Sequence, residues 1–179
     1  MFKDGFADDL AVGAPGETPD ASPKSGYVFA FLGGENGLTP WKGLDQAGLD
    51  SNELDDRFGQ ALAAGDLDGD GRADLAVGAP GKAPGTGPKS GSVLLFRGGA
   101  SGPAAWKGLD QAGLDTGELD DRFGAALAAV DFNGDGIVDL GVGAPGKTLD
   151  GAGASGEVFT FKGVDSTLAD CRAVSQTGG

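Results

Sequence analysis

The feature that most constrains this chain is an internal repeat with a period of 65 residues. The motif DLAVGAP occurs at 9–15 and again at 74–80, and DLGVGAP follows at 139–145. Two longer segments recur at the same spacing: WKGLDQAGLD at 41–50 and 106–115, and ELDDRFG at 53–59 and 118–124. A repeat of this length indicates an array of units, each of which buries its faces against its neighbours.

Each unit is expected to consist of short β-strands separated by glycine-rich turns. In the complete middle copy the pattern predicts strands over 58–67, 73–79, 91–98 and, more weakly, 104–111. The 36 glycines lack a three-residue period, which excludes collagen, and no window has the spacing of an amphipathic helix. Four strands in about 65 residues are typical of one β-propeller blade, so the predicted fold class is all-β, with four-stranded antiparallel blades.

The repeat divides the chain into about three blades. We expect a partial first blade at 1–57 without its leading strand, a complete second blade at 58–122, and a third blade at 123–163 with at least three strands. Residues 164–179 are predicted to form a diverged C-terminal tail. Propellers close with four to eight blades, so the ring is expected to be incomplete in one chain. Either the chain is a fragment of a longer propeller or copies self-associate through exposed strand edges.

Two loops crowd acidic side chains in the same order. The predicted metal ligands are Asp66, Asp68, Asp70, the backbone carbonyl of Arg72 and Asp74 in one loop, and Asp131, Asn133, Asp135, the backbone carbonyl of Ile137 and Asp139 in the other. The odd-numbered spacing lets a tight loop point successive oxygens at one hard cation, and a glycine at position 6 permits the turn. Without a cation, two carboxylates about 5 Å apart repel by about 1 kcal/mol in water.

Calcium is the predicted cation, with two full sites. All of the candidate ligands are oxygens and the chain has no histidine, which argues against zinc or copper. The loops resemble an EF-hand for six residues only, because position 12 is Val77 or Val142 instead of a bidentate glutamate. Between Asp4 and Asp9 only part of the loop pattern remains, so a third site there would be degenerate and is not counted with the two full sites. The alternative is a solvated hairpin turn that uses Asp and Asn to cap its own backbone.

These motifs together resemble FG-GAP repeats, as in the N-terminal β-propeller of integrin α subunits and in many bacterial surface or secreted proteins. The resemblance covers residues 4–163. The spacer GELDDRFG at 117–124 and the strand GSVLLFRGG at 91–99 look especially like those of bacterial members. Gly13-Ala14-Pro15 belongs to a copy whose Phe-Gly half is absent. The other matching residues are Phe58-Gly59, Asp66 to Asp74, Gly78-Ala79-Pro80, Phe123-Gly124, Asp131 to Asp139 and Gly143-Ala144-Pro145.

The resemblance implies a structural calcium loop between the first and second strands of a blade. It also implies an opposite, upper face whose loops contribute to partner binding. Integrin-like propellers have seven blades, which at this repeat length would require about 450 residues. The corresponding upper loops of this chain are 13–26, 78–91 and 143–156, with the acidic connections 45–57 and 110–122.

The charge balance limits the classes of partner. A formal net charge of −14 would repel phosphate backbones and anionic lipid, so no nucleic-acid partner is expected. No run approaches the roughly 20 apolar residues of a membrane span, so no membrane insertion is expected either. The single cysteine, Cys171, cannot form a disulfide within the chain. Extracellular calcium sites are weak, so a secreted or cell-surface location is expected, with a signal and further blades absent from this chain.

Three functions are open at this stage. The first is a non-catalytic module for extracellular adhesion or protein-ligand binding. The second is a lectin in which Trp41 and Trp106, at equivalent positions, stack on sugar rings, although either could instead fill a gap beside its blade. The third, less favoured, is a glycoside-active enzyme that uses a carboxylate pair such as Asp55/Asp56 or Asp120/Asp121. The structural alternative for these pairs is a solvated acidic connection.

Overall fold

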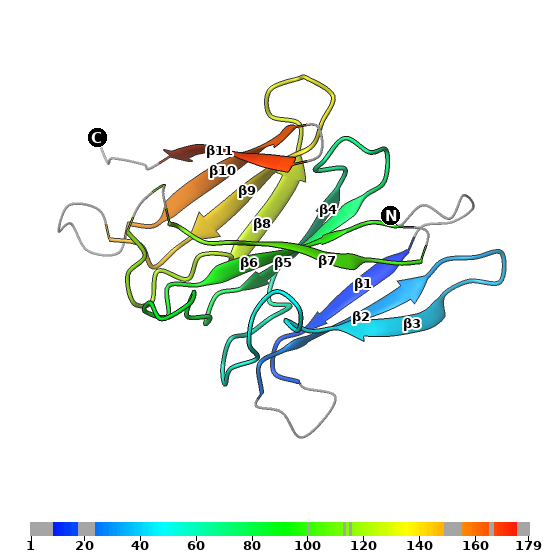
Figure 1. Cartoon of the computed structure of the whole chain (residues 1–179), viewed down its shortest axis with the longest axis horizontal. Coiled ribbons are helices and arrows are strands. Elements are labelled where there is room, and N and C mark those ends of the chain that lie inside the picture. The colour runs from blue at the N-terminus through cyan, green and yellow to red at the C-terminus, as the bar shows by residue number, and fades with distance from the viewer. Residues whose placement is uncertain are drawn as a thin grey trace.

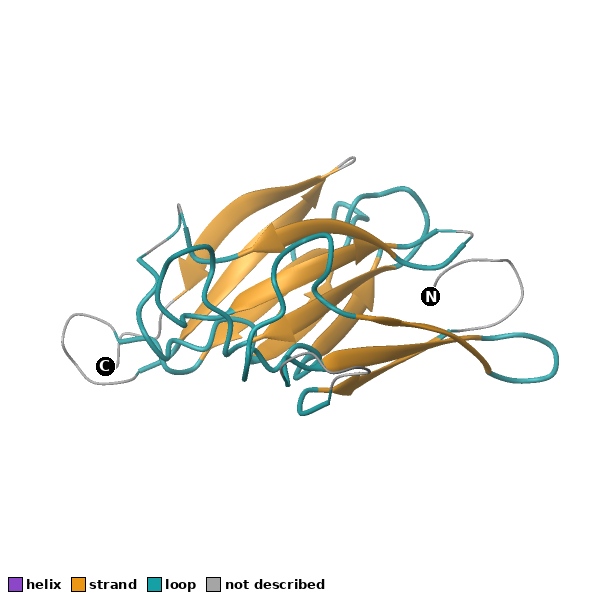
Figure 2. Ribbon diagram, turned by 60° about the horizontal axis from the view of Figure 1, so that its bottom comes forward, coloured by secondary structure: helices purple, strands orange, loops and turns teal. Residues whose placement is uncertain are grey.

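The computed structural model describes residues 9–17, 24–99, 101–112, 114, 116–148, 155–164 and, for the backbone, 167–174. Within these residues the fold is all-β, with three antiparallel sheets and no helix (Figures 1 and 2). The strands of each sheet follow one another along the chain and pair with their sequence neighbours. The predicted all-β class is therefore confirmed, and the described sheets do not close a ring.

The three sheets correspond to the three repeats. The first contains β1 (Leu10–Ala14), β2 (Tyr27–Leu32) and β3 (Thr39–Leu44). The second contains β4 (Leu62–Gly65), β5 (Asp74–Ala79), β6 (Ser92–Arg97) and β7 (Ala104–Leu109). The third contains β8 (Ala126–Val130), β9 (Asp139–Ala144), β10 (Glu157–Val164) and β11 (Thr167–Val174).

The third blade has a fourth strand inside the segment that was expected to be a diverged tail. β11 pairs with β10 in antiparallel register, with a bulge between Thr160 and Phe161. β7 ends at residue 109 and β11 at residue 174, which are 65 positions apart. The third blade thus has a fourth strand although its sequence no longer resembles the Trp segment of the other blades. Strand pairing uses backbone N–H and C=O groups, which do not depend on the side chains.

Two apolar clusters join consecutive blades. One lies between the first and second sheets and includes Val28, Phe58 and Leu75. The other lies between the second and third sheets and includes Val93, Phe123 and Phe159. Each cluster therefore holds the phenylalanine of a Phe-Gly motif, which precedes the first strand of its blade. Parallel bridges join Gly26 to Phe58 and Gly91 to Phe123, so each Phe-Gly segment also touches the preceding blade through its backbone.

Glycine is required where the blades approach most closely. A Cβ added to Gly13 would lie 1.9 Å from the carbonyl oxygen of Gly59, and one added to Gly78 would lie 2.0 Å from that of Gly124. Both distances are shorter than any non-bonded contact, so neither Gly13 nor Gly78 can be replaced by a residue with a side chain unless the backbone shifts. Gly143 occupies the same position in the third blade, where the nearest atom to an added Cβ is the Ala126 Cβ at 3.3 Å.

We therefore expect Gly78→Ala to lower the free energy of unfolding by about 1–3 kcal/mol, the usual effect of overpacking a closely fitted contact. Urea denaturation followed by tryptophan fluorescence measures this difference. Gly143→Ala is the matched control and should change the free energy of unfolding by less than about 0.5 kcal/mol. Equal effects of the two substitutions would contradict the close blade contact at Gly78.

Candidate metal centre

The first aspartate loop joins β4 to β5 and brings three of its predicted ligands together. Carboxylate oxygens of Asp66, Asp68 and Asp74 all lie within 4.8 Å of one another. Asp68 and Asp74 are buried, and Asp66 is half-buried. Three converging carboxylates in a partly buried loop form an oxygen-rich site of the kind that hard divalent cations prefer.

Backbone N–H groups hold the carboxylates in place. Asp66 accepts hydrogen bonds from the N–H of Asp70 at 3.0 Å and of Gly71 at 2.8 Å. Asp74 accepts from the N–H of Leu67 at 3.0 Å, which closes the loop, and from Gly98 at 2.9 Å, which ties it to the end of β6. The loop is thus shaped by its own backbone before any cation arrives.

The fourth predicted carboxylate of this loop lies outside the convergent group. Asp70 is exposed, and its side chain accepts hydrogen bonds from the N–H of Arg72 at 2.8 Å and from the Arg72 guanidinium at 3.0 Å. A second arginine, Arg97, places its Nε 2.8 Å from Asp68 Oδ2. These two guanidinium groups offset part of the negative charge of the loop.

The pKa of Asp74 reflects its burial and the acidic side chains around it. Burial, together with the charges of Asp68 and Asp70, raises the pKa of Asp74 to about 6. The N–H groups of Gly98 and Leu67 act in the opposite direction, because they stabilise the ionised carboxylate. A bound divalent cation would remove the cause of this charge crowding.

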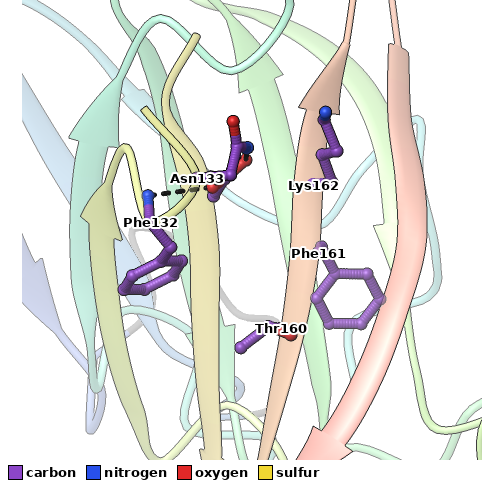
Figure 3. A pocket seen from close by; sticks show the side chains of 6 residues that line it. Phe132, Asn133, Thr160, Phe161 and Lys162 are labelled. Atoms are coloured by element: carbon purple, nitrogen blue, oxygen red, sulfur yellow. Dashed lines mark hydrogen bonds between the residues drawn. The ribbon is translucent and has the colours of Figure 1, made fainter. Parts of the chain in front are cut away.

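The second loop joins β8 to β9 and repeats the pattern with an amide in place of one carboxylate. Asp139 is buried and accepts hydrogen bonds from the N–H groups of Phe132 and Gly163, both at 2.9 Å. Asp74 accepts the two equivalent hydrogen bonds in the first loop. The Asn133 side-chain amide donates to Asp139 at 3.0 Å. A cavity of about 200 Å³ is lined by Phe132, Asn133, Asp139, Thr160, Phe161 and Lys162. Figure 3 shows Asn133 and Lys162 above the rings of Phe132 and Phe161.

Two aspartates of this second loop, the half-buried Asp131 and the exposed Asp135, have lowered pKa values. Hydrogen bonds from backbone N–H groups, that of Gly136 first, lower the pKa of Asp131. A hydrogen bond from Lys162, whose Nζ lies 2.8 Å from the carboxylate, lowers the pKa of Asp135. Both groups are therefore ionised near neutral pH and available as oxygen ligands.

The degenerate third loop falls mostly outside the described residues. Of the segment from Asp4 to Asp9, only Asp9 is described. Asp9 is buried and accepts a hydrogen bond from the N–H of Gly33 at 2.9 Å. This matches the bonds that Asp74 and Asp139 receive at equivalent positions, so the last aspartate of each loop anchors the start of β1, β5 or β9 to the following hairpin.

Sequence reasoning missed a pair of buried lysines on the opposite side of the blades. The side chain of Lys82 is 0% exposed; its Nζ donates to the carbonyl of Ser51 at 2.5 Å and lies 3.4 Å from Asp56 Oδ2. Lys147 repeats the arrangement with the carbonyl of Thr116 and with Asp121, again at 3.4 Å from the carboxylate. The constant separation of 26 residues within each Asp–Lys pair was the available sequence signal.

The carboxylate pairs considered for catalysis are split by the fold. Asp56 and Asp121 are buried, so the expectation that the whole connection is solvated was wrong for them. Burial raises the pKa of Asp56, while hydrogen bonds from Gln46 and from the N–H of Glu53 and the charge of Lys82 lower it. Asp55 and Asp120 are exposed, and their φ angles are positive, at 65° and 67°.

A groove of about 300 Å³ lies beside these residues, formed by the segments that precede β4 and β8 and by the loop between β5 and β6. We call it the loop-face groove; its lining residues are Asp55, Arg57, Pro80, Gly81, Lys89, Asp120 and Arg122. All of them come from the segments that the family resemblance implied as upper loops. Arg57 and Arg122 have positive φ angles of 57° and 59°, which non-glycine residues adopt at a cost of about 1–2 kcal/mol.

The two tryptophans are half-buried and pack against other groups. The Arg97 guanidinium lies 4.4 Å from the centre of the Trp106 ring. Trp41 packs so closely on the next blade that a Cβ added to Gly102 would lie 2.4 Å from its ring. Trp41 thus contacts the neighbouring blade, as in the gap-filling alternative, whereas the contact of Trp106 with Arg97 lies within the second blade.

The fold and its loops define a repeat protein built from propeller-type blades with aspartate-rich loops. Residues 58–96 and 123–161 match the FG-GAP repeat family. The chain therefore carries FG-GAP repeats, as the motifs indicated, and each match begins at the phenylalanine of a Phe-Gly motif.

Curated relatives include two kinds of protein. Phosphatidylinositol-glycan-specific phospholipase D of Homo sapiens is 39% identical over 111 residues, which are 60% of this chain and 13% of the relative. Integrin alpha-10 of Homo sapiens is 32% identical over 149 residues, which are 82% of this chain and 12% of the relative. Integrin alpha-PS5 of Drosophila melanogaster is 45% identical over 82 residues, 44% of this chain and 8% of the relative. The chain spans only a small part of each relative's length.

Proposed function

We propose that this chain is a calcium-stabilised, non-catalytic binding module that acts in adhesion or ligand recognition outside the cell. The observation that carries the proposal is the convergence of Asp66, Asp68 and Asp74 in a loop whose pattern recurs one blade later. In this account the loops stabilise the blades, and the opposite face binds the ligand.

Calcium supplies positive charge to the oxygen cluster when it binds. The residues that would hold it are the predicted ligands of the two loops, with Asp66, Asp68 and Asp74 already close together in the first. Asp74 and Asp139 also connect each loop to the next hairpin through the N–H groups of Gly98 and Gly163. Filling the loops would therefore stiffen the junction of β5 with β6 and that of β9 with β10.

The loop-face groove is the candidate ligand site. Its wall carries Arg57, Lys89 and Arg122 beside Asp55 and Asp120, so cationic and anionic groups alternate on one small surface. Lys89 is held in position because its Nζ donates to the carbonyl of Leu54 at 2.8 Å. Such a surface suits a ligand with a carboxylate, which a guanidinium binds through two parallel hydrogen bonds.

A binding role is favoured over catalysis by the state of the acidic groups. The chain has no histidine. Asp56 and Asp121, the buried members of the carboxylate pairs, each lie 3.4 Å from a buried lysine, and so they serve the packing of the connections. The relatives include a phospholipase as well as integrins, and this chain spans 13% of the phospholipase.

The proposed location is the cell surface or the extracellular medium, where calcium is high enough to fill weak sites of this type. In the part of the chain that the structure describes, no helix is long and apolar enough to span a membrane. Self-association of copies into a larger propeller stays a prediction.

The proposal predicts calcium-dependent binding through the groove. On an array of purified extracellular proteins and glycans, the chain should bind specific spots in millimolar calcium and lose them in EGTA. Arg57→Ala with Arg122→Ala should weaken the same binding about tenfold or more, because each guanidinium bond to a charged group contributes about 1.5–3 kcal/mol. Lys24→Ala, at an exposed lysine outside the groove, is the control. Glycan spots lost on Trp106→Ala but kept in the double arginine variant would favour the lectin instead.

A further inference from the structure

A basic side chain from a neighbouring strand lies against each of the two aspartate loops. In the first loop, Arg97 at the end of β6 places its Nε 2.8 Å from Asp68 Oδ2. In the second, Lys162 in β10 places its Nζ 2.8 Å from Asp135 Oδ2. Both cations come from the third strand of their sheet, outside the loop that they contact.

The two cations occupy the same place in the repeat. Residues 97 and 162 are 65 positions apart, which is the period of the chain. The equivalent residue of the first blade is Leu32, at the end of β2. The aspartate loop of that blade keeps only part of the pattern. A basic residue therefore accompanies each complete loop and is replaced by leucine beside the degenerate one, which links its charge to the carboxylates of the loop.

Burial strengthens the electrostatic effect of Arg97 on the first loop. The side chain of Asp68 is 5% exposed, whereas that of Arg97 is 41% exposed. Asp68 belongs to the group of three carboxylates whose oxygens lie within 4.8 Å of one another. A cation beside such a group favours the ionised form that the neighbouring carboxylates disfavour. The guanidinium thus supplies some of the positive charge that a divalent cation would bring.

Arg97 is not needed to orient Asp68. The N–H of Asp70 donates a hydrogen bond to Asp68 Oδ1 at 3.2 Å, so the loop backbone already holds one oxygen of this carboxylate. Arg97 contacts the other oxygen, Oδ2. The second loop is built in the same way, since the N–H of Ile137 donates to Asp135 Oδ1 at 3.0 Å and Lys162 contacts Oδ2.

The Arg97 guanidinium has a further contact outside the loop. Its central carbon lies 4.4 Å from the centre of the Trp106 ring, in β7. The face of an indole ring attracts a cation within about 6 Å of its centre. Arg97 can therefore leave the carboxylate and still keep a favourable contact within its own blade.

We propose that Arg97 is an exchangeable counter-cation of the first loop, which pairs with Asp68 in the ion-free protein and withdraws towards Trp106 when a divalent cation binds. Lys162 has the same role at Asp135 in the second loop. This rests on the proposed function, because it takes the two loops as calcium sites. It adds that both basic residues lower the calcium affinity, since the ion competes with a positive charge already in place.

The test uses a reporter chain that carries Trp41→Phe and Asp131→Ala. The chain has two tryptophans, so Trp106 is then the sole source of tryptophan emission. Asp131→Ala is expected to leave calcium binding to the first loop alone. Equilibrium dialysis with a radioactive tracer measures the affinity. The proposal predicts that calcium changes the Trp106 emission with a midpoint equal to the dissociation constant from dialysis.

Arg97→Leu in the reporter chain should bind calcium about two- to fivefold more tightly, the range expected when a partly exposed ion pair no longer has to be broken. Its Trp106 emission should not respond to calcium. Arg97→Lys should keep the affinity of the reporter chain, because Lys162 reaches its own loop from the equivalent position. If Arg97 instead held Asp68 in place for the ion, Arg97→Leu would bind calcium more weakly.

Arg72→Ile is the matched control for the emission. Arg72 pairs with Asp70, and the second loop has Ile137 at this position. The substitution removes an equal charge from the same loop without touching Asp68 or Trp106, so the emission should still respond to calcium. Dialysis of Arg97→Leu in the otherwise unmodified chain, where one of two ions should bind more tightly, does not depend on the reporter substitutions.

Three results would overturn the counter-cation role while leaving the proposed function intact. One is weaker or unchanged calcium binding by Arg97→Leu. Another is a Trp106 emission that stays constant while dialysis records bound calcium. The third is an emission response that survives Arg97→Leu. Absence of bound calcium from both the reporter chain and the unmodified chain would instead overturn the proposed function, and the counter-cation role with it.

Discussion

Lys82→Met is expected to lower the free energy of unfolding by about 3–5 kcal/mol, the usual result of removing one partner from a buried ion pair. Lys82 and Asp56 are both 0% exposed, and Lys82 Nζ also donates to the carbonyl of Ser51. Without the ammonium group, a buried carboxylate and a backbone carbonyl lose their cation together. Urea denaturation at pH 7, with calcium held constant, measures the difference.

The pH dependence of this variant gives a second readout. Burial already raises the pKa of Asp56, and loss of the Lys82 charge raises it further. A carboxyl whose folded pKa is raised destabilises the fold when ionised, so the variant should regain stability relative to wild type as the pH falls from neutral towards that pKa. Addition of Asp56→Asn should recover part of the loss at pH 7, because no buried charge then remains.

Lys24→Met is the control for these measurements, since Lys24 is exposed. It should change the free energy of unfolding by no more than about 0.5 kcal/mol. An equally small effect of Lys82→Met would show that the Asp56–Lys82 pair contributes little to holding the connection between the first and second blades.

Phe123→Ala is expected to lower the free energy of unfolding by about 3–5 kcal/mol. Phe123 is 0% exposed, and its ring makes edge-to-face contacts with Phe159 and Phe161 at 5.3 and 6.1 Å between centroids. It lies in the apolar cluster that joins the second and third blades, so its loss opens a cavity at that junction. Phe132→Ala is the control, because Phe132 is 53% exposed, and it should cost less than about 1 kcal/mol.

The position of the unfolding transition also distinguishes two kinds of blade contact. If the Phe-Gly motif joins the blades into one cooperative unit, Phe123→Ala should shift the whole transition to lower urea. A variant in which only the third blade unfolds early, with the first and second unchanged, would show that the blades are independent. Hydrogen exchange measured separately for β5 and β9 reports which of these occurs.

The repeat predicted the blades well because strand and turn positions depend on local pattern. The middle copy gave expected strands that contain β4, β5, β6 and β7. β11 was missed because residues 164–179 have lost the Trp segment by which the fourth strand was recognised. Antiparallel pairing with β10 restores a strand there through backbone hydrogen bonds, which leave no signature in the sequence.

The aspartate loops could be found from spacing, whereas the 26-residue spacing of the Asp–Lys pairs does not by itself indicate that they are buried. Asp55 and Asp56 are identical neighbours in the sequence, yet the fold exposes the first and buries the second. Asp55 and Arg57 have positive φ angles and exposed side chains, and the carboxylate of Asp56 between them lies 3.4 Å from Lys82 Nζ. Backbone geometry of this kind, at non-glycine residues, is outside what residue patterns predict.

Calcium binding measured by equilibrium dialysis with a radioactive tracer tests the central claim most directly. The account predicts two ions per chain, with dissociation constants of about 10⁻⁴ to 10⁻³ M if the sites are of the weak extracellular type. Asp66→Ala and Asp131→Ala should each remove one ion, and the double variant should bind none. A chain that binds no calcium up to about 10 mM, or a double variant that binds as wild type does, would contradict the account.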